Sequence, residues 1–308
     1  MVFTNNNSTE AVAYQQPLPN GISHNKTKPK VITSRNGHDQ EDARENEEIL
    51  NLYQPETIPQ TLHANTPPKL YDINFVFPFH ILETDHVRLE PFVPSKHLSG
   101  FLKLPAESWT HFGELGPYTQ QTALEDIESF RIDPRCLLLA VIDKQVEKLG
   151  RDGFAGVYGL IEMNDEFMHA IFGLINILPI YHCTHINTHA MSLILRYLFE
   201  DLSLIRVQYD AVTHNTPSIN SAKKFGFREE GICRNFNGLV PLHKKVGDPK
   251  ERKSRSQDMW VASMTDWDWF NGVKGEMEGK VRRTVVDTTL LMSDMAEKAD
   301  GHGHSKHH

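Results

Sequence analysis

The stretch that most constrains the fold is an apolar segment that runs through a short polar loop into an amphipathic helix. Residues 168–178, "MHAIFGLINIL", have the length and composition of a buried strand. After the loop at 179–185, apolar residues recur at the spacing of one buried helical face: Ala190, Leu193, Ile194, Tyr197 and Leu198. A strand joined to a helix in this way is the unit of an α/β sheet, so the chain is expected to contain one.

Strand and helix patterns alternate on both sides of this unit. Strands are expected at 86–92, 136–143, 153–163, 168–178, 206–212, 227–236 and 258–264. Helices are expected at 94–104, 119–130 and 218–225. The last of these helices would begin at Ser218 as its N-cap and end before Gly226. Meandering strands followed by strand–helix–strand units predict a mixed α/β domain with one central sheet.

Composition divides the chain into three parts. Residues 1–68 are rich in Asn, Gln, Ser, Thr, Pro and charge, which predicts a disordered or loosely packed N-terminal arm. Residues 69–270 carry the apolar pattern and have the length of one domain. Residues 271–308 are expected to form a C-terminal helix and a polar tail. The basic segment 244–255 is interpreted as a solvated insertion, with attraction of an acidic substrate or a phosphate as the alternative.

Several classes of partner are not expected. A net charge of −8 argues against nucleic acid, because phosphate neutralisation needs clustered Lys and Arg. No apolar run approaches the roughly 20 residues of a membrane span. Cys136, Cys183 and Cys233 are an odd, sparse set, which predicts reduced thiols in an intracellular protein. Because residues 1–16 do not resemble a signal peptide, a cytoplasmic location is expected, and the oligomeric state stays open.

The loop and helix start at 179–189 admit four interpretations. A zinc site is the first, with Cys183 and three histidines as ligands: His182, His185 and His189. No second cluster of ligands with recognisable spacing accompanies them. Cys183 suggests a thiol activated by the helix N-terminus. The free N–H groups of the first helical turn suggest an anion site, and the loop has suitable small polar side chains: Thr184, Asn187 and Thr188. The fourth interpretation is an ordinary capped helix with incidental histidines.

Several segments, in order along the chain, resemble the motifs of one enzyme family. Residues 215–234, "NTPSINSAKKFGFREEGICR", resemble the Asn-x-x-Ser…Gly-Phe…Glu-Gly…Arg signature of the GNAT superfamily of acyl-CoA-dependent N-acetyltransferases. The resemblance is closest to the RimJ/RimL-like branch. Similar likenesses lie at 107–127, 170–179, 183–211 and 256–269. Together they extend from Val87 to Trp269, so the resemblance covers nearly the whole predicted domain.

The resemblance implies a mixed sheet of six to seven strands, flanked by helices and splayed between its fourth and fifth strands. Acetyl-CoA would lie in the gap, with its pyrophosphate at the loop after the fourth strand. The implied cofactor-binding residues are Asn176, Ile177, Leu178, Thr184, His185, Asn187, Thr188, Asn215 and Ser218. Two positions depart from the branch: Cys183 replaces a common Arg, and His189 replaces a Glu. The lost Arg removes a charge-assisted phosphate contact, which protonated histidines of the loop would partly offset.

The implied reaction transfers an acetyl group from acetyl-CoA to a primary amine, of a small molecule or a protein N-terminus, by direct attack on the thioester. An alkyl amine with a pKa of about 10 needs a base or a desolvating pocket to become neutral. Backbone N–H groups near 176–178 would stabilise the oxyanion. Ser221 is the candidate proton donor and Glu162 the candidate base, although packing or a solvated turn explains each equally well. Trp109 and Tyr118 are expected to line the acceptor pocket or to pack in the core.

No metal is expected in this scheme. The alternative function is a non-catalytic acyl-CoA-binding or regulatory GNAT domain. Three features favour it: the missing Arg at Cys183, a Ser at position 221 where many relatives have a Tyr, and the lack of an evident base.

Overall fold

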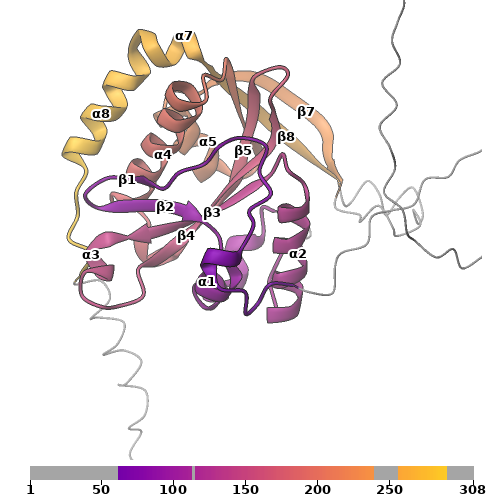
Figure 1. The fold of residues 1–308 in the computed structure, drawn as a ribbon. Helices are drawn as coiled ribbons and strands as arrows, with labels where there is room; N and C mark the ends of the chain where they lie inside the picture. Colours follow the sequence, from indigo (N-terminus) through magenta and orange to yellow (C-terminus); the bar gives the residue numbers. More distant parts are fainter. Residues whose placement is uncertain (1–61, 113–114, 239–255, 290–308) are drawn as a thin grey trace, which may run out of the picture. The chain divides into compact units, whose positions relative to one another are not determined.

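The structure, a computed structural model, describes residues 62–112, 115–238 and 256–289. An eight-stranded sheet organises these residues, in the order β1-β2-β3-β4-β5-β6-β8-β7 (Figure 1). Neighbouring strands are antiparallel except for the parallel pair β5 and β6. The predictions for residues 1–61, for the basic segment 244–255 and for the tail from residue 290 lie outside the described residues.

All seven predicted strands are present, and one more extends the sheet beyond the expected six to seven. The strands are β1 (Leu82–Glu83), β2 (Val87–Pro91), β3 (Leu137–Asp143), β4 (Phe154–Asn164), β5 (His169–Ile177), β6 (Arg206–Val212), β7 (Arg228–Gly238) and β8 (Ser256–Thr265). The addition is β1, whose two residues are too few to show a periodic pattern.

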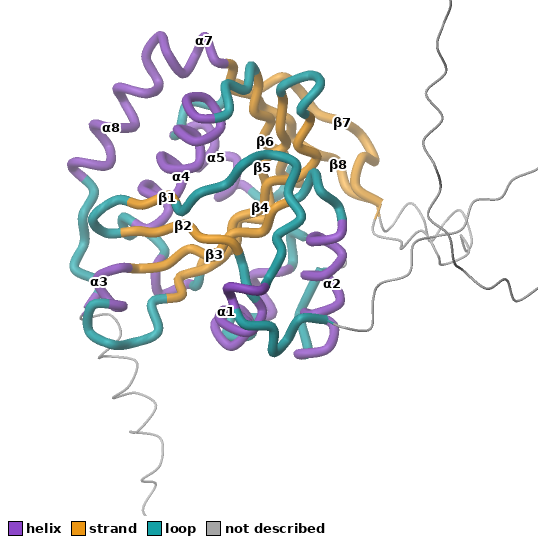
Figure 2. The backbone as a smooth tube through the Cα atoms, in the orientation of Figure 1, coloured by secondary structure: helices purple, strands orange, loops and turns teal. Residues whose placement is uncertain are grey.

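The helices agree with the predicted segments (Figure 2). The α-helices are α1 (Pro94–Phe101), α2 (Gln120–Ile132), α3 (Lys144–Glu147), α4 (Ile186–Arg196), α5 (Thr216–Lys224), α7 (Asp266–Asp268) and α8 (Lys274–Arg283). Shorter turns are η1 (Pro68–Leu70), η2 (Ala106–Trp109), η3 (Pro179–Tyr181), η4 (Tyr197–Asp201) and η5 (Trp269–Val273). None of the helices in the described ranges is long and apolar enough to cross a membrane.

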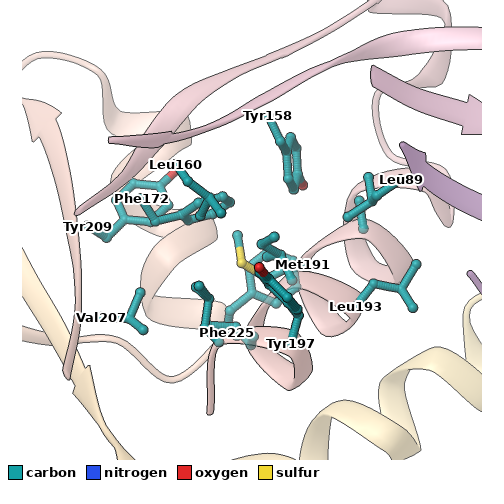
Figure 3. Close-up of a cluster of buried hydrophobic side chains, with 14 of the residues drawn as sticks. Leu89, Tyr158, Leu160, Phe172, Met191, Leu193, Tyr197, Val207, Tyr209 and Phe225 are labelled. Carbon is teal, nitrogen blue, oxygen red and sulfur yellow. The ribbon is translucent and has the colours of Figure 1, made fainter. Parts of the chain in front are cut away.

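Two cores hold the layers together, one on each face of the sheet. The larger core lies between the sheet and α4, with α8 outside α4 (Figures 1 and 3). It includes Tyr158, Phe172 and Tyr209 from the strands and Met191 and Leu193 from α4. The second core lies between β2–β4 and the pair α1 and α2. Each fully buried large apolar side chain contributes about 1.5–3 kcal/mol, so both faces stabilise the sheet.

The start of α5 corrects one prediction. Its N-cap is Asn215 rather than Ser218, and the Asn215 Oδ1 atom accepts a hydrogen bond from the Ser218 backbone N–H at 3.3 Å. Pro217 lies in the first turn, where its fixed φ and missing N–H are tolerated. The helix therefore starts earlier than expected. Gly226, with φ of +97°, follows the helix end as predicted.

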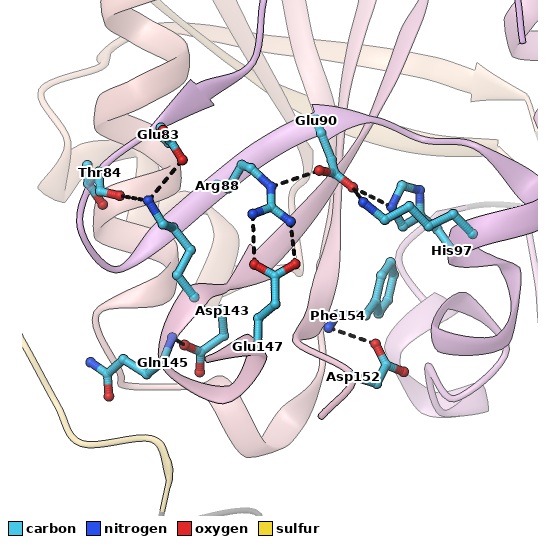
Figure 4. Close-up of polar contacts among 12 residues, drawn as sticks. Glu83, Thr84, Arg88, Glu90, His97, Asp143, Gln145, Glu147, Asp152 and Phe154 are labelled. Atoms are coloured by element: carbon cyan, nitrogen blue, oxygen red, sulfur yellow. Dashed lines mark hydrogen bonds and ion pairs between the residues drawn. The ribbon is translucent and has the colours of Figure 1, made fainter. Parts of the chain in front are cut away.

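Ion pairs fix the outer strands to α1 and α3 (Figure 4). Arg88 on β2 donates to Glu90 at 2.7 Å and to both Glu147 oxygens at 2.7 and 2.5 Å. Glu90 is buried and also contacts Lys96 and His97 on α1. Burial alone would raise the pKa of Glu90, but the hydrogen bonds from these partners hold it at about 2. These paired side chains lie near the β1 edge of the sheet. Because their charges are paired with one another, we assign them a structural role.

Candidate functional site

The parallel strands β5 and β6 separate halfway along their length. Residues 169–172 of β5 are in register with residues 206–209 of β6, and the pairing stops there. β5 continues to Ile177 with β4 alone as its neighbour. Leu174 has φ of +52°, so the backbone is irregular where the strands part. We call residues 169–172 and 206–209 the paired end, and residues 173–177 and 210–212 the open end. Among the described strands, none pairs with the edge of 173–177 that faces β6, and at its far end the Ile177 carbonyl oxygen lies 3.0 Å from His182 Nε2.

The chain leaves the open end of β5 through η3 and enters α4. The N-cap His185 forms no side-chain cap hydrogen bond. The Thr184 hydroxyl donates to the Tyr181 carbonyl at 2.7 Å and accepts from the Ile186 N–H at 3.3 Å. The next N–H groups of the first turn, at 187 and 188, have no carbonyl four residues back within the helix. The α4 N-terminus therefore presents donors and a favourable dipole to an anion.

A polar bridge joins three elements beside the open end, on the α4 face of the sheet. The Tyr158 hydroxyl on β4 donates to the Asn187 side-chain oxygen on α4. Asn187 Nδ2 in turn donates to Ser221 Oγ on α5 at 3.2 Å. Nearer the start of α5, Ser218 Oγ lies 2.9 Å from the Tyr209 hydroxyl. The structure thus brings together three residues predicted for the site: Asn187, Ser218 and Ser221.

The histidines at the start of α4 turn away from this bridge, which corrects two expectations. His185 is 0% exposed, and the rings of His86, His185 and His189 lie 5.3–5.6 Å apart. Burial first, and the neighbouring histidines second, lower the pKa of His185 to about 4. Burial also lowers the pKa of His189, whose Nε2 lies 3.1 Å from the Thr284 carbonyl oxygen. Both rings are neutral at pH 7 and enclosed by protein, so neither supplies a charge to a phosphate.

The side chains at the end of β5 are also engaged within the protein. Asn176 is buried, and its Nδ2 donates to Ser108 Oγ at 3.0 Å on the face opposite α4. Ile177 is buried in the larger core, and Leu178 is partly buried between the two cores. The contacts predicted for 176–178 therefore fall to backbone atoms. Within the described ranges, no three His, Cys, Asp or Glu side chains are arranged to hold a metal ion.

On that opposite face, the segment that includes η2 crosses the open end. Ser108 contacts Asn176 of β5, and the His111 ring lies 5.2 Å from His214, two residues beyond β6. Below this segment, β6 presents Asp210, which is half-buried and which no motif singled out. Alternation along "RVQYDAV" was the available signal, since it places Asp210 on the face opposite the buried Tyr209.

Three other predicted residues occupy different surroundings. Trp109 is 3% exposed, with ring centroids 5.4 Å from Phe101 and 5.0 Å from Tyr118, so it belongs to the second core rather than to a pocket wall. Tyr118 is half-buried at the edge of that core. Glu162 is exposed beside the paired end, where the adjacent Ile161 is in register with β5 residue 171. Glu162 therefore does not lie at the open end.

Comparison with known proteins agrees with this geometry. Residues 86–228 match the family model described as an acetyltransferase (GNAT) domain. The fold is similar to that of a GCN5-related N-acetyltransferase from Brucella melitensis, with 25% identity, a TM-score of 0.55, and coverage of 66% of this chain and 85% of that one. It is also similar to a probable acetyltransferase of the GNAT family from Chromobacterium violaceum ATCC 12472, with 22% identity, a TM-score of 0.54, and coverage of 70% and 100%. None of the curated proteins matches the chain.

The family match and the sheet that opens between β5 and β6 concern the same part of the chain. The matched segment contains both strands of the open end and the helix that follows β5. Residues 86–228 are thus similar to a GNAT acetyltransferase domain, and the fold is one that solved GNAT structures share.

Proposed function

We propose that the protein is an acetyl-CoA-dependent N-acetyltransferase of the RimJ/RimL-like branch, which acetylates a primary amine of a small molecule or of a protein N-terminus. One observation carries the proposal: the open end combines β5 backbone groups that lack a strand partner with an α4 N-terminus that lacks a side-chain cap. Buried backbone groups are normally paired within a fold, so a stretch left unpaired suits an extended ligand.

The two parts of the open end suit the two parts of CoA. A pantetheine arm carries amides that pair with an exposed strand edge, here residues 173–177 of β5. The pyrophosphate at its far end suits the α4 N-terminus, with the N–H groups of 187 and 188 and the neighbouring Thr184 as donors. We assign Asn215 a positioning role, because its side chain holds the first turn of α5 beside the gap between β5 and β6. Ser218 extends this wall through its contact with Tyr209.

Ser221 is the proposed proton donor to the departing thiolate. Its Oγ accepts a hydrogen bond from Asn187 Nδ2, which leaves the hydroxyl hydrogen for donation. We place the activity in the cytoplasm, because Cys136, Cys183 and Cys233 are free thiols, as is usual in a reducing compartment.

A matched pair of arginine variants tests the cofactor position. Cys183→Arg places a guanidinium on the exposed loop before α4, while Cys233→Arg places it on the exposed surface of β7. If the pyrophosphate binds at α4, the first variant should lower the Kd for CoA about tenfold, the effect of one charge-assisted hydrogen bond. The second should leave Kd unchanged. Isothermal titration with CoA measures both, and equal affinities would place the pyrophosphate elsewhere.

Turnover tests the reaction itself. Thiol release from acetyl-CoA would be followed with benzylamine, 1,5-diaminopentane and a peptide with a free N-terminus. We expect catalysis with at least one of these amines. Tight CoA binding without turnover of any of them would instead support a non-catalytic acyl-CoA-binding domain.

A further inference from the structure

One carboxylate stands at the point where β5 and β6 part. Phe172 and Tyr209 form the last pair in register, so the next residues across the gap are Gly173 and Asp210. Gly173 has no side chain to fill the space beside Asp210. The irregular residue Leu174 follows at once, with φ of +52°. Asp210 therefore borders the first unpaired backbone of β5. With the pyrophosphate at α4, the thioester end of the pantetheine arm would lie towards this point.

Asp210 lies on the side of the sheet opposite the proposed cofactor-binding helix α4. Tyr209 and Ala211, its neighbours along β6, both belong to the core beneath α4. Asp210 therefore projects to the opposite face, where it is half-buried. The α4 face holds the polar bridge and the proposed cofactor-binding helix. The opposite face of β6, which carries Asp210 and which we call the open face, is thus left for the amine. The segment at 108–111 lies above it.

A chain of hydrogen bonds along alternate residues of β6 orients this carboxylate. Arg206 donates to both Glu230 oxygens at 2.6 and 2.7 Å and to Gln208 Oε1 at 2.9 Å. Because its oxygen is held by Arg206, the Gln208 amide directs its Nε2 to Asp210, at 3.0 and 3.1 Å from the two oxygens. Gln208 is a positioning residue in this arrangement, since it acts through Asp210.

In the described ranges, Asp210 has hydrogen bonds from Gln208 but no ion-pair partner of its own. Glu230, by contrast, is paired with Arg206. Burial raises the pKa of Asp210, and the charges of Glu162 on β4 and Glu230 on β7 raise it further, while Gln208 and Arg206 lower it. A carboxylate of raised pKa is a stronger base, and its acidic neighbours favour a cationic ligand.

We infer that Asp210 is the general base of the proposed acetyl transfer and that the acceptor binds as a protonated amine on the open face of β6. The inference rests on the proposed function. Asp210 takes one proton from the ammonium group, and the freed nitrogen lone pair forms a bond to the acetyl carbonyl carbon. The C–S bond then breaks, and its electron pair leaves with sulfur. The second nitrogen proton passes to the thiolate through the Ser221 hydroxyl, and Asp210 releases its proton to water.

The test compares two amines that differ in protonation at neutral pH. Benzylamine is protonated at pH 7 and needs a base, whereas aniline is already neutral. Asp210→Asn should lower kcat for benzylamine at least about 100-fold, the usual contribution of a general base, and should change kcat for aniline less than about threefold. The Kd for CoA should not change. Asp165→Asn, which alters an exposed carboxylate in the β4–β5 turn, should match the wild type with both amines.

A second variant keeps the test decisive if Asp210→Asn folds poorly. Gln208→Met removes the donor to Asp210 but leaves the carboxylate. Because that hydrogen bond lowers the pKa of Asp210, its loss should move the acid limb of the kcat/KM profile to higher pH. An unshifted limb would overturn the inference. So would full benzylamine activity in Asp210→Asn, an equal loss with both amines, or a His111→Gln or His214→Gln variant that shows the amine-dependent loss instead. A wild type that binds CoA but acetylates no amine would overturn the proposed function as well.

Discussion

The paired end and the open end of β5 and β6 consist of consecutive residues of the same two strands, yet they have opposite characters. At the paired end, Phe172 and Tyr209 are buried in an edge-to-face contact with centroids 5.9 Å apart. One residue further on, Gly173 and Asp210 face each other across strands that no longer pair. Packing and the proposed chemistry are therefore separated along the strand, so the two ends should respond differently to substitution.

Phe172→Ala should have the largest effect and should act through stability. Phe172 is 0% exposed and contacts Tyr158 and Tyr209, so its truncation leaves a cavity costing about 3–5 kcal/mol. Urea unfolding measures the loss. Phe167→Ala, at a residue 63% exposed, is the control and should change the free energy of unfolding by less than about 0.5 kcal/mol. A loss below 1 kcal/mol at Phe172 would show that the paired end is not a centre of packing.

Gly156→Ala should come next, because the added β-carbon on β4 would push against the open end of β5. A β-carbon at residue 156 would lie 2.3 Å from the Asn176 carbonyl oxygen and 2.8 Å from Ile177 Cα. We expect a destabilisation of about 3 kcal/mol from this overpacking, with a weaker Kd for CoA. Gly231→Ala is a matched control, since Gly231 has the same φ of +154° but no atom within 4 Å of the added carbon. Equal losses in the two variants would attribute the whole effect to backbone strain.

The buried histidine behind the open end should make stability depend on pH. The unfolded chain binds a proton on His185 near pH 6.5, whereas the folded ring has a pKa of about 4. Stability is therefore undiminished above pH 6.5 and falls as the pH decreases from 6.5 towards 4. At pH 5 the expected loss from this residue is about 2 kcal/mol. Unfolding of the wild type and of His185→Gln at pH 7 and pH 5 measures it. The variant should lose less stability over this interval, and an identical loss would exclude His185 as the cause.

Tyr158→Phe should have the smallest effect on stability and should act on the open end. Loss of the hydroxyl leaves the Asn187 oxygen without this donor, which costs about 1 kcal/mol and loosens the bridge to Ser221. The Kd for CoA should rise several-fold. Tyr197→Phe, which removes a hydrogen bond to the Pro78 carbonyl far from the gap, should cost similar stability without changing Kd. An equal rise in the Kd for CoA in both variants would show that the bridge has no specific part in CoA binding.

The sequence predicted the elements better than the contacts between them. Periodicity predicted the seven longer strands and the main helices, because burial of one face repeats every two or 3.6 residues. The resemblance predicted a sheet splayed between its fourth and fifth strands, and the structure has this opening between β5 and β6, after the pair Phe172 and Tyr209. Ser218 was the wrong N-cap. A helix also accepts a proline such as Pro217 in its first turn, so the pattern alone does not decide whether the cap is Asn215 or Ser218.

The directions of single side chains depend on partners distant in sequence, and there the predictions were weaker. His185 and His189 face His86 and Thr284, about 100 residues away, so their burial could not be read from the loop. Trp109 was left between pocket and core because only the packing against α1 and α2 decides it. No motif singled out Asp210, because its position where the strands part depends on the register between β5 and β6, which no local motif encodes.

The strand order also has a consequence for how the chain is built during synthesis. Among the described strands, β8 lies between β6 and β7 and is made last. When a ribosome has released residues only up to 238, β7 has none of the other described strands beside it, and β6 touches the growing sheet along four residues of β5. The emergence of residues 256–265 gives both strands their antiparallel neighbour at once. Nascent chains stalled before that point are therefore expected to expose two strand edges and to depend most on chaperones.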